Sequence, residues 1–123
     1  MSSGYVYLIQ FSGKNFKGKA VKIGGTNDIS RRIKELKKDG YQGWEYVRLL
    51  ALRKIPANYR GSAIVTNETG WQAAEKDAHH HFDLQRMGGT ELFSWNKQSP
   101  LRDYLSFFDR IGTNAWPYKE ENS

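Results

Sequence analysis

The sequence has no cysteine, no long apolar run, no internal repeat and no low-complexity segment. Without cysteine the chain has no disulfide framework, no thiol nucleophile and no cysteine ligands for zinc. The first residues lack the charged and apolar regions of a signal peptide. No stretch approaches the roughly 20 apolar residues of a membrane span. These absences fit a cytoplasmic protein that has no membrane partner.

What the sequence does contain is enough for one folded domain. Its 123 residues can build one hydrophobic core but not two. Hydrophobic residues make up 38% of the chain and charged residues 26%, a balance that argues against disorder. We expect a single domain over residues 1–112, followed by a mostly polar C-terminal tail over residues 113–123.

The charge is strongly basic. Nineteen Lys and Arg outnumber thirteen Asp and Glu, which leaves a net charge of +6. Such an excess favours a polyanionic partner, and nucleic acid is the commonest one. The same charge would also serve solubility alone, so composition does not separate a nucleic-acid-binding protein from an ordinary basic one.

Hydrophobic patterning predicts three long or moderately long strands, three helices and one short strand. The strands are expected over 4–11, 20–25, 45–55 and 90–95. The helices are expected from an Asn27 or Asp28 cap to Gly40, over 71–87 ahead of Gly88-Gly89, and from Ser99-Pro100 to about 111. Residues 56–70 are expected to be a loop with a short strand around Ile64 and Val65. The order β-β-α-β-α-β-α predicts an α+β fold, in which a small antiparallel or mixed sheet is flanked by helices.

Two charged residues interrupt the apolar stripes of the predicted helices. Arg32 shares a helix face with Ile29 and Leu36, and burying a guanidinium without a partner is costly. On periodicity alone, an Arg at the edge of the stripe that extends its head to water is the simpler interpretation. Glu75 falls within the inward stripe of the helix over 71–87. A carboxylate there needs a cation, and an ion pair and a metal ion are equally good candidates.

Three consecutive histidines follow on that helix. His79, His80 and His81 splay around the helix axis, so at most two could serve one ion. The spacing is not that of a zinc site, and no third strong ligand is expected nearby. His79, one turn after Glu75, is a better candidate for a polar helper than His80, which should face solvent.

The first two strands bring a tyrosine and a lysine together if they pair with the right parity. Tyr5, Tyr7 and Ile9 point to one side of the first strand. Lys22 alternates with apolar neighbours in the return strand, so Tyr7 and Lys22 share a face when residue 7 pairs with a residue of opposite parity. A Lys ammonium favours the phenolate form of a neighbouring Tyr, which suits proton abstraction. A cross-strand pair on a solvent face is the simpler alternative.

Together these residues resemble the motifs of the GIY-YIG nuclease superfamily, and most of all its phage T5-type and meiotically-upregulated branch. The matching segments are Tyr5-Val6-Tyr7-Leu8-Ile9, Lys22-Ile23-Gly24, Thr26-Asn27-Asp28 with Arg32, the helix with Glu75, His79 and Phe82, and, loosely, Thr90-Glu91-Leu92-Phe93. The resemblance covers about residues 4–95. The chain departs from the superfamily pattern in that Tyr5 stands at the first GIY position, Lys22 replaces the second Tyr, and the loop between the strands is longer.

The resemblance implies a single-metal phosphodiester hydrolase. Glu75 would hold one Mg²⁺ or Mn²⁺ ion. Tyr7, or in its place Lys22, would act as the general base toward water. Arg32 would stabilise charge on the phosphoryl group. Tyr5 and His79 would support the hydrogen-bond network.

Nucleic acid, most of all DNA, is then the expected partner, and no oligomeric state is predicted. Basic residues outside the site are candidates for contacts with the phosphate backbone, foremost Lys34, Lys37 and Lys38, and also Lys14, Lys17 and Arg53. Two alternatives are a non-catalytic nucleic-acid-binding module of the same fold and a small phage-type interaction protein. The first has no use for an inward glutamate beside phosphate, and the second makes the basic charge incidental.

Overall fold

A computed structural model describes residues 3–13 and 18–115. It contains β1 (Gly4–Gly13), β2 (Lys19–Thr26), α1 (Ile29–Asp39), β3 (Trp44–Ile55), α2 (Trp71–His81), a 3-10 helix η1 (Asp83–Gln85), β4 (Leu92–Ser94), α3 (Leu101–Phe108) and β5 (Thr113–Asn114). The expected α+β class and the order of the seven expected elements are confirmed, with η1 and β5 as additions. Within the described residues, no helix is both long and apolar enough to span a membrane.

The sheet has five strands in the order β4-β2-β1-β3-β5, and every neighbouring pair is antiparallel. β1 is central, and its hairpin with β2 pairs Tyr7 with Gly24 and Ile9 with Lys22. Residue 7 therefore pairs with a residue of opposite parity, as the shared face of Tyr7 and Lys22 requires.

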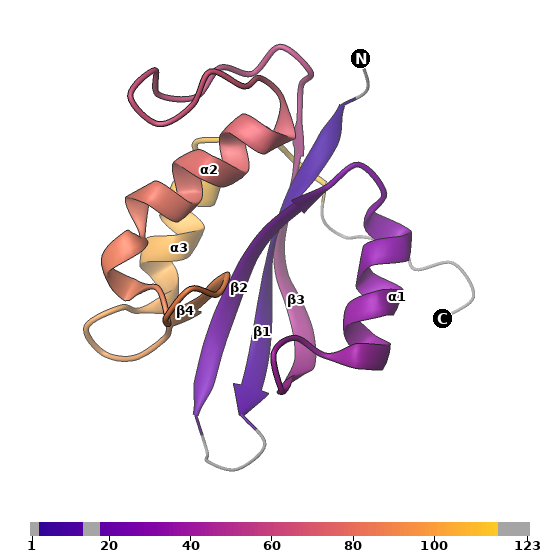
Figure 1. Cartoon of the computed structure of the whole chain (residues 1–123), viewed down its shortest axis with the longest axis vertical. Coiled ribbons are helices and arrows are strands. Elements are labelled where there is room, and N and C mark those ends of the chain that lie inside the picture. Colours follow the sequence, from indigo (N-terminus) through magenta and orange to yellow (C-terminus); the bar gives the residue numbers. More distant parts are fainter. Residues whose placement is uncertain (1–2, 14–17, 116–123) are drawn as a thin grey trace.

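Helices cover both faces of the sheet. α1 lies on one side of the strands, and α2 and α3 lie on the other (Figure 1). The alternation of β1 explains this arrangement, because Val6 and Leu8 are buried in the core under α2 and α3, whereas Tyr7 and Ile9 are buried in the core under α1. Side chains of both faces of β1 are thus removed from water, which makes it the structural centre of the domain.

α1 begins and ends where the sequence predicts. The Asp28 side chain accepts a hydrogen bond from the Arg31 backbone N–H at 3.1 Å, which caps the helix N-terminus. Gly40, at φ 67°, ends the helix by donating its N–H to the Leu36 carbonyl. The apolar side chains Ile29, Ile33 and Leu36 are buried against the sheet, as expected.

The second helix is shorter than predicted. α2 stops at His81 instead of continuing to residue 87, and η1 follows it. The chain has to turn here because Arg86 pairs with Phe93 through a β-bridge, which needs extended backbone. Leu84, which would have continued the helix, is 98% exposed. The predicted short strand around residues 64–65 is also wrong, since Val65 donates to the Ser62 carbonyl in a turn.

The predicted C-terminal tail begins with residues that belong to the sheet. Thr113 and Asn114 form β5 and pair with Lys54 and Arg53. Arg53 is buried and donates to the Phe108 carbonyl at 2.9 Å, so the prediction that it contacts a phosphate backbone is wrong. The rest of the tail, residues 116–123, and the candidate contacts Lys14 and Lys17 lie outside the described residues.

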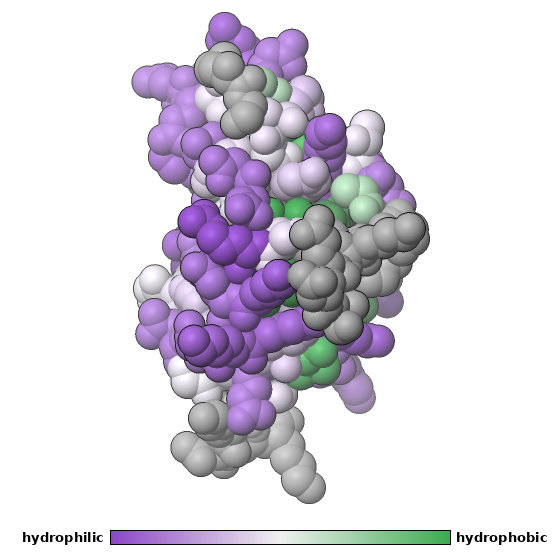
Figure 2. Space-filling view, turned by 90° about the vertical axis from the view of Figure 1, so that its right-hand side faces the viewer, coloured by the Kyte–Doolittle hydropathy of each residue, from purple (hydrophilic) through white to green (hydrophobic). Residues whose placement is uncertain are grey.

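The surface on the α1 side is mostly hydrophilic. Figure 2 shows this side, where hydrophilic side chains dominate and apolar ones appear only in small areas. The exposed residues of α1 include Lys34, Lys37 and Lys38, so the helix presents basic side chains outward while its apolar stripe faces the sheet.

Candidate active site

Lys22 is the centre of a polar cluster inside the sheet. Its side chain is 0% exposed, an unusual position for a lysine. The ammonium donates to the Tyr7 hydroxyl at 3.0 Å and to Glu91 Oε1 at 2.7 Å. Burial by itself would lower the pKa of Lys22, but Tyr7 and Glu91 more than offset it, so the pKa lies above its ordinary value. Lys22 is therefore a buried cation, and its hydrogen bonds with two partners offset the free-energy cost of removing the ammonium from water.

The Tyr7 hydroxyl oxygen accepts hydrogen bonds from two positively charged side chains. Besides the Lys22 ammonium, Arg32 Nε donates to the Tyr7 hydroxyl oxygen at 3.3 Å. Arg32 also reaches Glu35 at 3.5 Å, and its side chain is 34% exposed. Arg32 is thus neither buried without a partner nor simply extended into water, since its guanidinium lies between the tyrosine and the surface. Two cationic donors on one hydroxyl oxygen stabilise negative charge on that oxygen.

The space around Gly24 explains why the third position of the Lys22-Ile23-Gly24 segment is a glycine. A Cβ atom there would overlap the Tyr7 hydroxyl oxygen and would lie 2.7 Å from Lys22 Nζ. Gly24 pairs directly with Tyr7 across the hairpin, so its missing side chain leaves the space that the ring and the ammonium occupy.

Glu75 reaches the same cluster from α2, where it is half-buried. Burial, followed by the negative charge of Glu91, raises the pKa of Glu75 to about 7, although Lys22 and a hydrogen bond from the Gly25 backbone N–H act in the opposite direction. A carboxylate held this way lacks enough positive charge nearby. An added cation would stabilise its ionised form.

His79 lies one turn after Glu75, and Nε2 is 2.7 Å from the Ile23 carbonyl oxygen. A carbonyl can only accept, so Nε2 carries the proton and Nδ1 carries the lone pair. Burial lowers the pKa of His79, which favours the neutral imidazole that can bind a metal ion. His80, by contrast, is exposed, as predicted.

Glu91 is the residue that the sequence-based site lacked. One ligand atom each from Glu75, His79 and Glu91 lies within 4.8 Å of the others, a separation that one ion can span. The expectation that no third ligand lies near His79 is therefore wrong. This donor set consists of two carboxylates and one imidazole. It is richer in oxygen than the histidine and cysteine sets typical of zinc, and therefore suits Mn²⁺ or Mg²⁺. The only signal in the sequence was the loosely matching Thr90-Glu91-Leu92-Phe93 segment.

The cluster lies at the edge of β2, beside the first residue of β4. β4 pairs with β2 only over Ala20 to Lys22, and the Ile23 N–H then bonds to the Glu91 carbonyl at 3.1 Å. Beyond that point no described strand pairs with β2, and side chains of α2 bind its edge instead: His79 Nε2 donates to the Ile23 carbonyl at 2.7 Å, and the Gly25 N–H donates to the Glu75 carboxylate. This topology lets Arg32 approach from one face of the sheet and Glu75 from the other.

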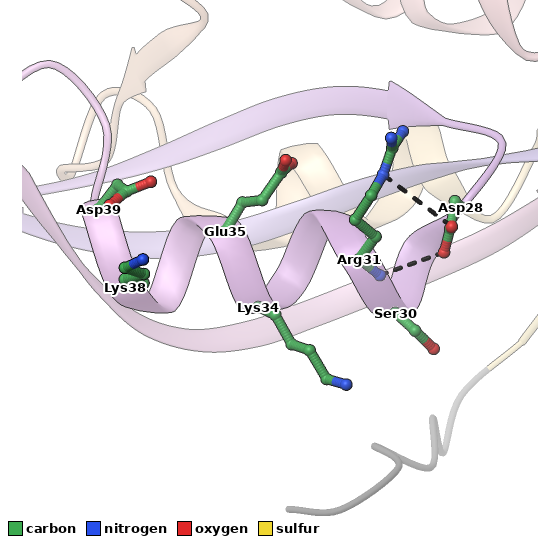
Figure 3. A pocket seen from close by; sticks show the side chains of 7 residues that line it. All are labelled: Asp28, Ser30, Arg31, Lys34, Glu35, Lys38 and Asp39. Atoms are coloured by element: carbon green, nitrogen blue, oxygen red, sulfur yellow. Dashed lines mark hydrogen bonds and ion pairs between the residues drawn. The ribbon is translucent and has the colours of Figure 1, made fainter.

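The remaining predicted residues lie around this cluster. Tyr5 packs against the core under α1, and among the described residues it makes no hydrogen bond with the cluster. Lys34 and Lys38 lie on the exposed side of α1 and line a surface hollow together with acidic side chains, in which Lys34 and Glu35 point to opposite sides of the helix (Figure 3). Lys37 lies over the Tyr46 ring at 5.5 Å. The basic side chains of α1 thus alternate with acidic ones and do not form a purely basic patch.

Comparison with known proteins agrees with the resemblance seen in the sequence. No curated protein and no solved structure matches the chain significantly. The profile of the T5orf172 domain family matches residues 4–111, which include every residue of the cluster. Domains of this kind occur in nuclease-associated proteins related to the GIY-YIG type. Because the match covers most of the chain, the protein belongs to the T5orf172 domain family.

Proposed function

We propose that this protein is a metal-dependent endonuclease that hydrolyses phosphodiester bonds in DNA. The observation that carries the proposal is the convergence of Tyr7, Lys22, Arg32 and Glu75 at the edge of β2, although they come from two strands and two helices. A purely structural ion pair would account for Lys22 and Glu91. It would not account for a second cation on the Tyr7 hydroxyl or for a half-buried Glu75 with a raised pKa.

Tyr7 is the better candidate for the general base. Its hydroxyl oxygen accepts from Lys22 and Arg32, so negative charge developing there as the proton leaves is stabilised. Lys22 has a pKa above its ordinary value and therefore stays protonated at neutral pH. A protonated ammonium cannot accept a proton from water, which makes Lys22 a hydrogen-bond donor to Tyr7 and not the base.

Arg32 would stabilise the reacting phosphoryl group. Its Nε is bound to Tyr7, while part of its guanidinium lies toward the surface. A planar guanidinium that is held on one edge can offer its remaining N–H groups to two phosphate oxygens. A charge-stabilising group would then lie beside the proton acceptor, which supports the proposal.

Glu75 would hold a divalent cation, and the donor set fits one. When bound, Mg²⁺ or Mn²⁺ supplies Lewis-acid polarisation of a phosphate oxygen and stabilises the leaving oxygen. Glu75 needs such a charge, because in its absence burial and Glu91 raise its pKa to about 7. The Gly25 backbone N–H bonds to the Glu75 carboxylate and limits its orientation.

The net charge of +6 supports a polyanionic substrate, and a phosphodiester is the substrate that these residue types suit. Lys34, Lys37 and Lys38 extend the positive charge along α1 from Arg32. Acidic neighbours on the same helix reduce that field, so we expect modest affinity and little sequence preference from this domain alone.

The proposal is tested by incubating supercoiled plasmid and single-stranded DNA with the protein in Mg²⁺, Mn²⁺ or EDTA. We expect metal-dependent nicking, which falls by about 100-fold or more in Glu75→Gln and in Arg32→Ala. Arg102→Ala, which changes an exposed arginine on α3, is the matched control and should cleave like the wild type. Cleavage at wild-type rates in either site variant would exclude the assignment. Metal-independent binding without cleavage would instead favour the non-catalytic module.

A further inference from the structure

Both backbone polar groups of Glu91 are hydrogen-bonded, although the residue lies in a loop. Its N–H donates to the Tyr41 hydroxyl at 3.0 Å, and its carbonyl accepts from the Ile23 N–H at 3.1 Å. The turn before it is also closed, since the Thr90 hydroxyl donates to the Met87 carbonyl at 2.6 Å. The residue is therefore held from both sides just before β4 begins.

The Glu91 side chain points from this fixed backbone into the polar cluster. Its Oε1 lies 2.7 Å from Lys22 Nζ, and the side chain is 37% exposed. The ion pair with the buried Lys22 accounts for Oε1. In addition, a carboxylate oxygen of Glu91 lies within 4.8 Å of one ligand atom each of Glu75 and His79.

The Glu91 carboxylate has two oxygens, so it can pair with Lys22 and bind a metal ion at the same time. Lys22 uses Oε1, and a carboxylate has a second oxygen that can bind a cation at the same time. Two carboxylates side by side, Glu75 and Glu91, repel each other unless a positive charge lies between them. The Lys22 ammonium supplies only part of the positive charge that the two carboxylates require, because it also donates a hydrogen bond to Tyr7.

We propose that Glu91 is a further residue of the site, where it completes a three-ligand set for the divalent cation with Glu75 and His79 and holds the Lys22 ammonium beside Tyr7. This inference rests on the proposed function, and it adds two protein ligands to the one that Glu75 provides. Glu91 thereby links the metal side of the cluster to the tyrosine side. A carboxylate shared in this way fixes the distance between the cation and the proton acceptor.

The test is direct binding of Mn²⁺ to the full-length, metal-free protein, measured by titration calorimetry and by the EPR signal of free Mn²⁺. We expect Glu91→Gln to weaken Mn²⁺ binding at least tenfold, since even residues that only support metal ligands cost about 10- to 100-fold in affinity. Glu91→Asp keeps the charge but withdraws the carboxylate by one methylene, and it should also weaken binding. Asp83→Asn removes an exposed acid that pairs with Arg86 at 3.7 Å, and it should bind Mn²⁺ like the wild type.

The outcomes separate this inference from the proposed function. If the wild type binds Mn²⁺, Glu75→Gln does not, and Glu91→Gln binds like the wild type, Glu91 is no ligand and the inference alone fails. If the wild type binds no Mn²⁺ at millimolar concentration, both the metal-dependent function and the inference fail. Should Asp83→Asn weaken binding as much as Glu91→Gln, general negative charge explains the effect, and the three-ligand set is overturned. Circular dichroism in EDTA establishes that each variant is folded.

Discussion

Replacing Glu75 by glutamine should stabilise the metal-free protein, which is unusual for a change within an active site. Glutamine has the same shape and can still accept the hydrogen bond from the Gly25 N–H, but it has no charge to bury beside Glu91. In the wild type, ionisation of Glu75 is less favourable in the folded chain than in the unfolded one. The folded protein therefore loses stability as this carboxyl deprotonates.

The size of the effect follows from the pKa of Glu75. A rise from 4.5 to about 7 corresponds to about 3 kcal/mol of folding free energy lost above pH 7, because a tenfold change in proton affinity is about 1.4 kcal/mol. Since the folded pKa is the higher one, this loss is absent below about pH 4 and accumulates between pH 4.5 and 7. The advantage of Glu75→Gln should thus be about 1 kcal/mol at pH 5 and about 3 kcal/mol at pH 8.

The assay is urea unfolding in EDTA at pH 5 and pH 8, followed by tryptophan fluorescence. At pH 8 the variant should also melt roughly 10 °C higher than the wild type. Glu68→Gln is the control, since Glu68 pairs with Lys76 on the surface at 2.7 Å and its removal should change stability by less than about 1 kcal/mol at either pH. An advantage of Glu75→Gln that is equal at pH 5 and pH 8, or a loss of stability, would refute the idea that a buried charge is the cause.

Three further predictions concern the hairpin, the C-terminal strand and the substrate. Gly24→Ala should lower the free energy of unfolding by about 1–3 kcal/mol and abolish cleavage, because its Cβ would displace the Tyr7 hydroxyl, whereas Gly89→Ala, which has open space around it, should be close to neutral in urea unfolding. Arg53→Met should cost about 2–4 kcal/mol in the same measurement, because the guanidinium binds the Phe108 carbonyl and the C-terminal residues from a buried position, and an unchanged midpoint would contradict this. DNA binding, measured by fluorescence anisotropy in EDTA, should weaken steeply as salt rises from 50 to 200 mM, and salt-independent binding would argue against phosphate contacts.

The parts of the fold that the sequence predicts are those governed by local pattern. α1 follows from an Asp28 cap, an apolar stripe and a terminal glycine, all within one stretch of chain. The period of a strand put Tyr7 and Lys22 on a shared face on the condition that the hairpin has the right parity, and the structure supplies that parity. Charges in otherwise apolar stripes marked Arg32 and Glu75, since burying them requires a reason.

Glu91 as a member of the site, the early end of α2 and the burial of Arg53 were missed because each depends on contacts that the local periodic pattern does not reveal. Glu91 meets Lys22 across 69 positions of the chain, and neither periodicity nor capping carries information about that approach. The early end of α2 depends on the bridge between Arg86 and Phe93, and the burial of Arg53 depends on carbonyl and carboxylate groups beyond α3.

The sequence by itself determined the α+β class and marked four of the polar side chains that converge, because each of these depends on the local pattern of a helix or a strand. Only the tertiary structure decided the parity of the hairpin, and only it decided that the chain turns after His81 and brings Glu91 beside Lys22 at the edge of β2. The physical reason is that the position of Glu91 depends on how β4 pairs with β2 and on the Tyr41 hydroxyl, and a strand of three residues gains its place from its partner and not from its own sequence.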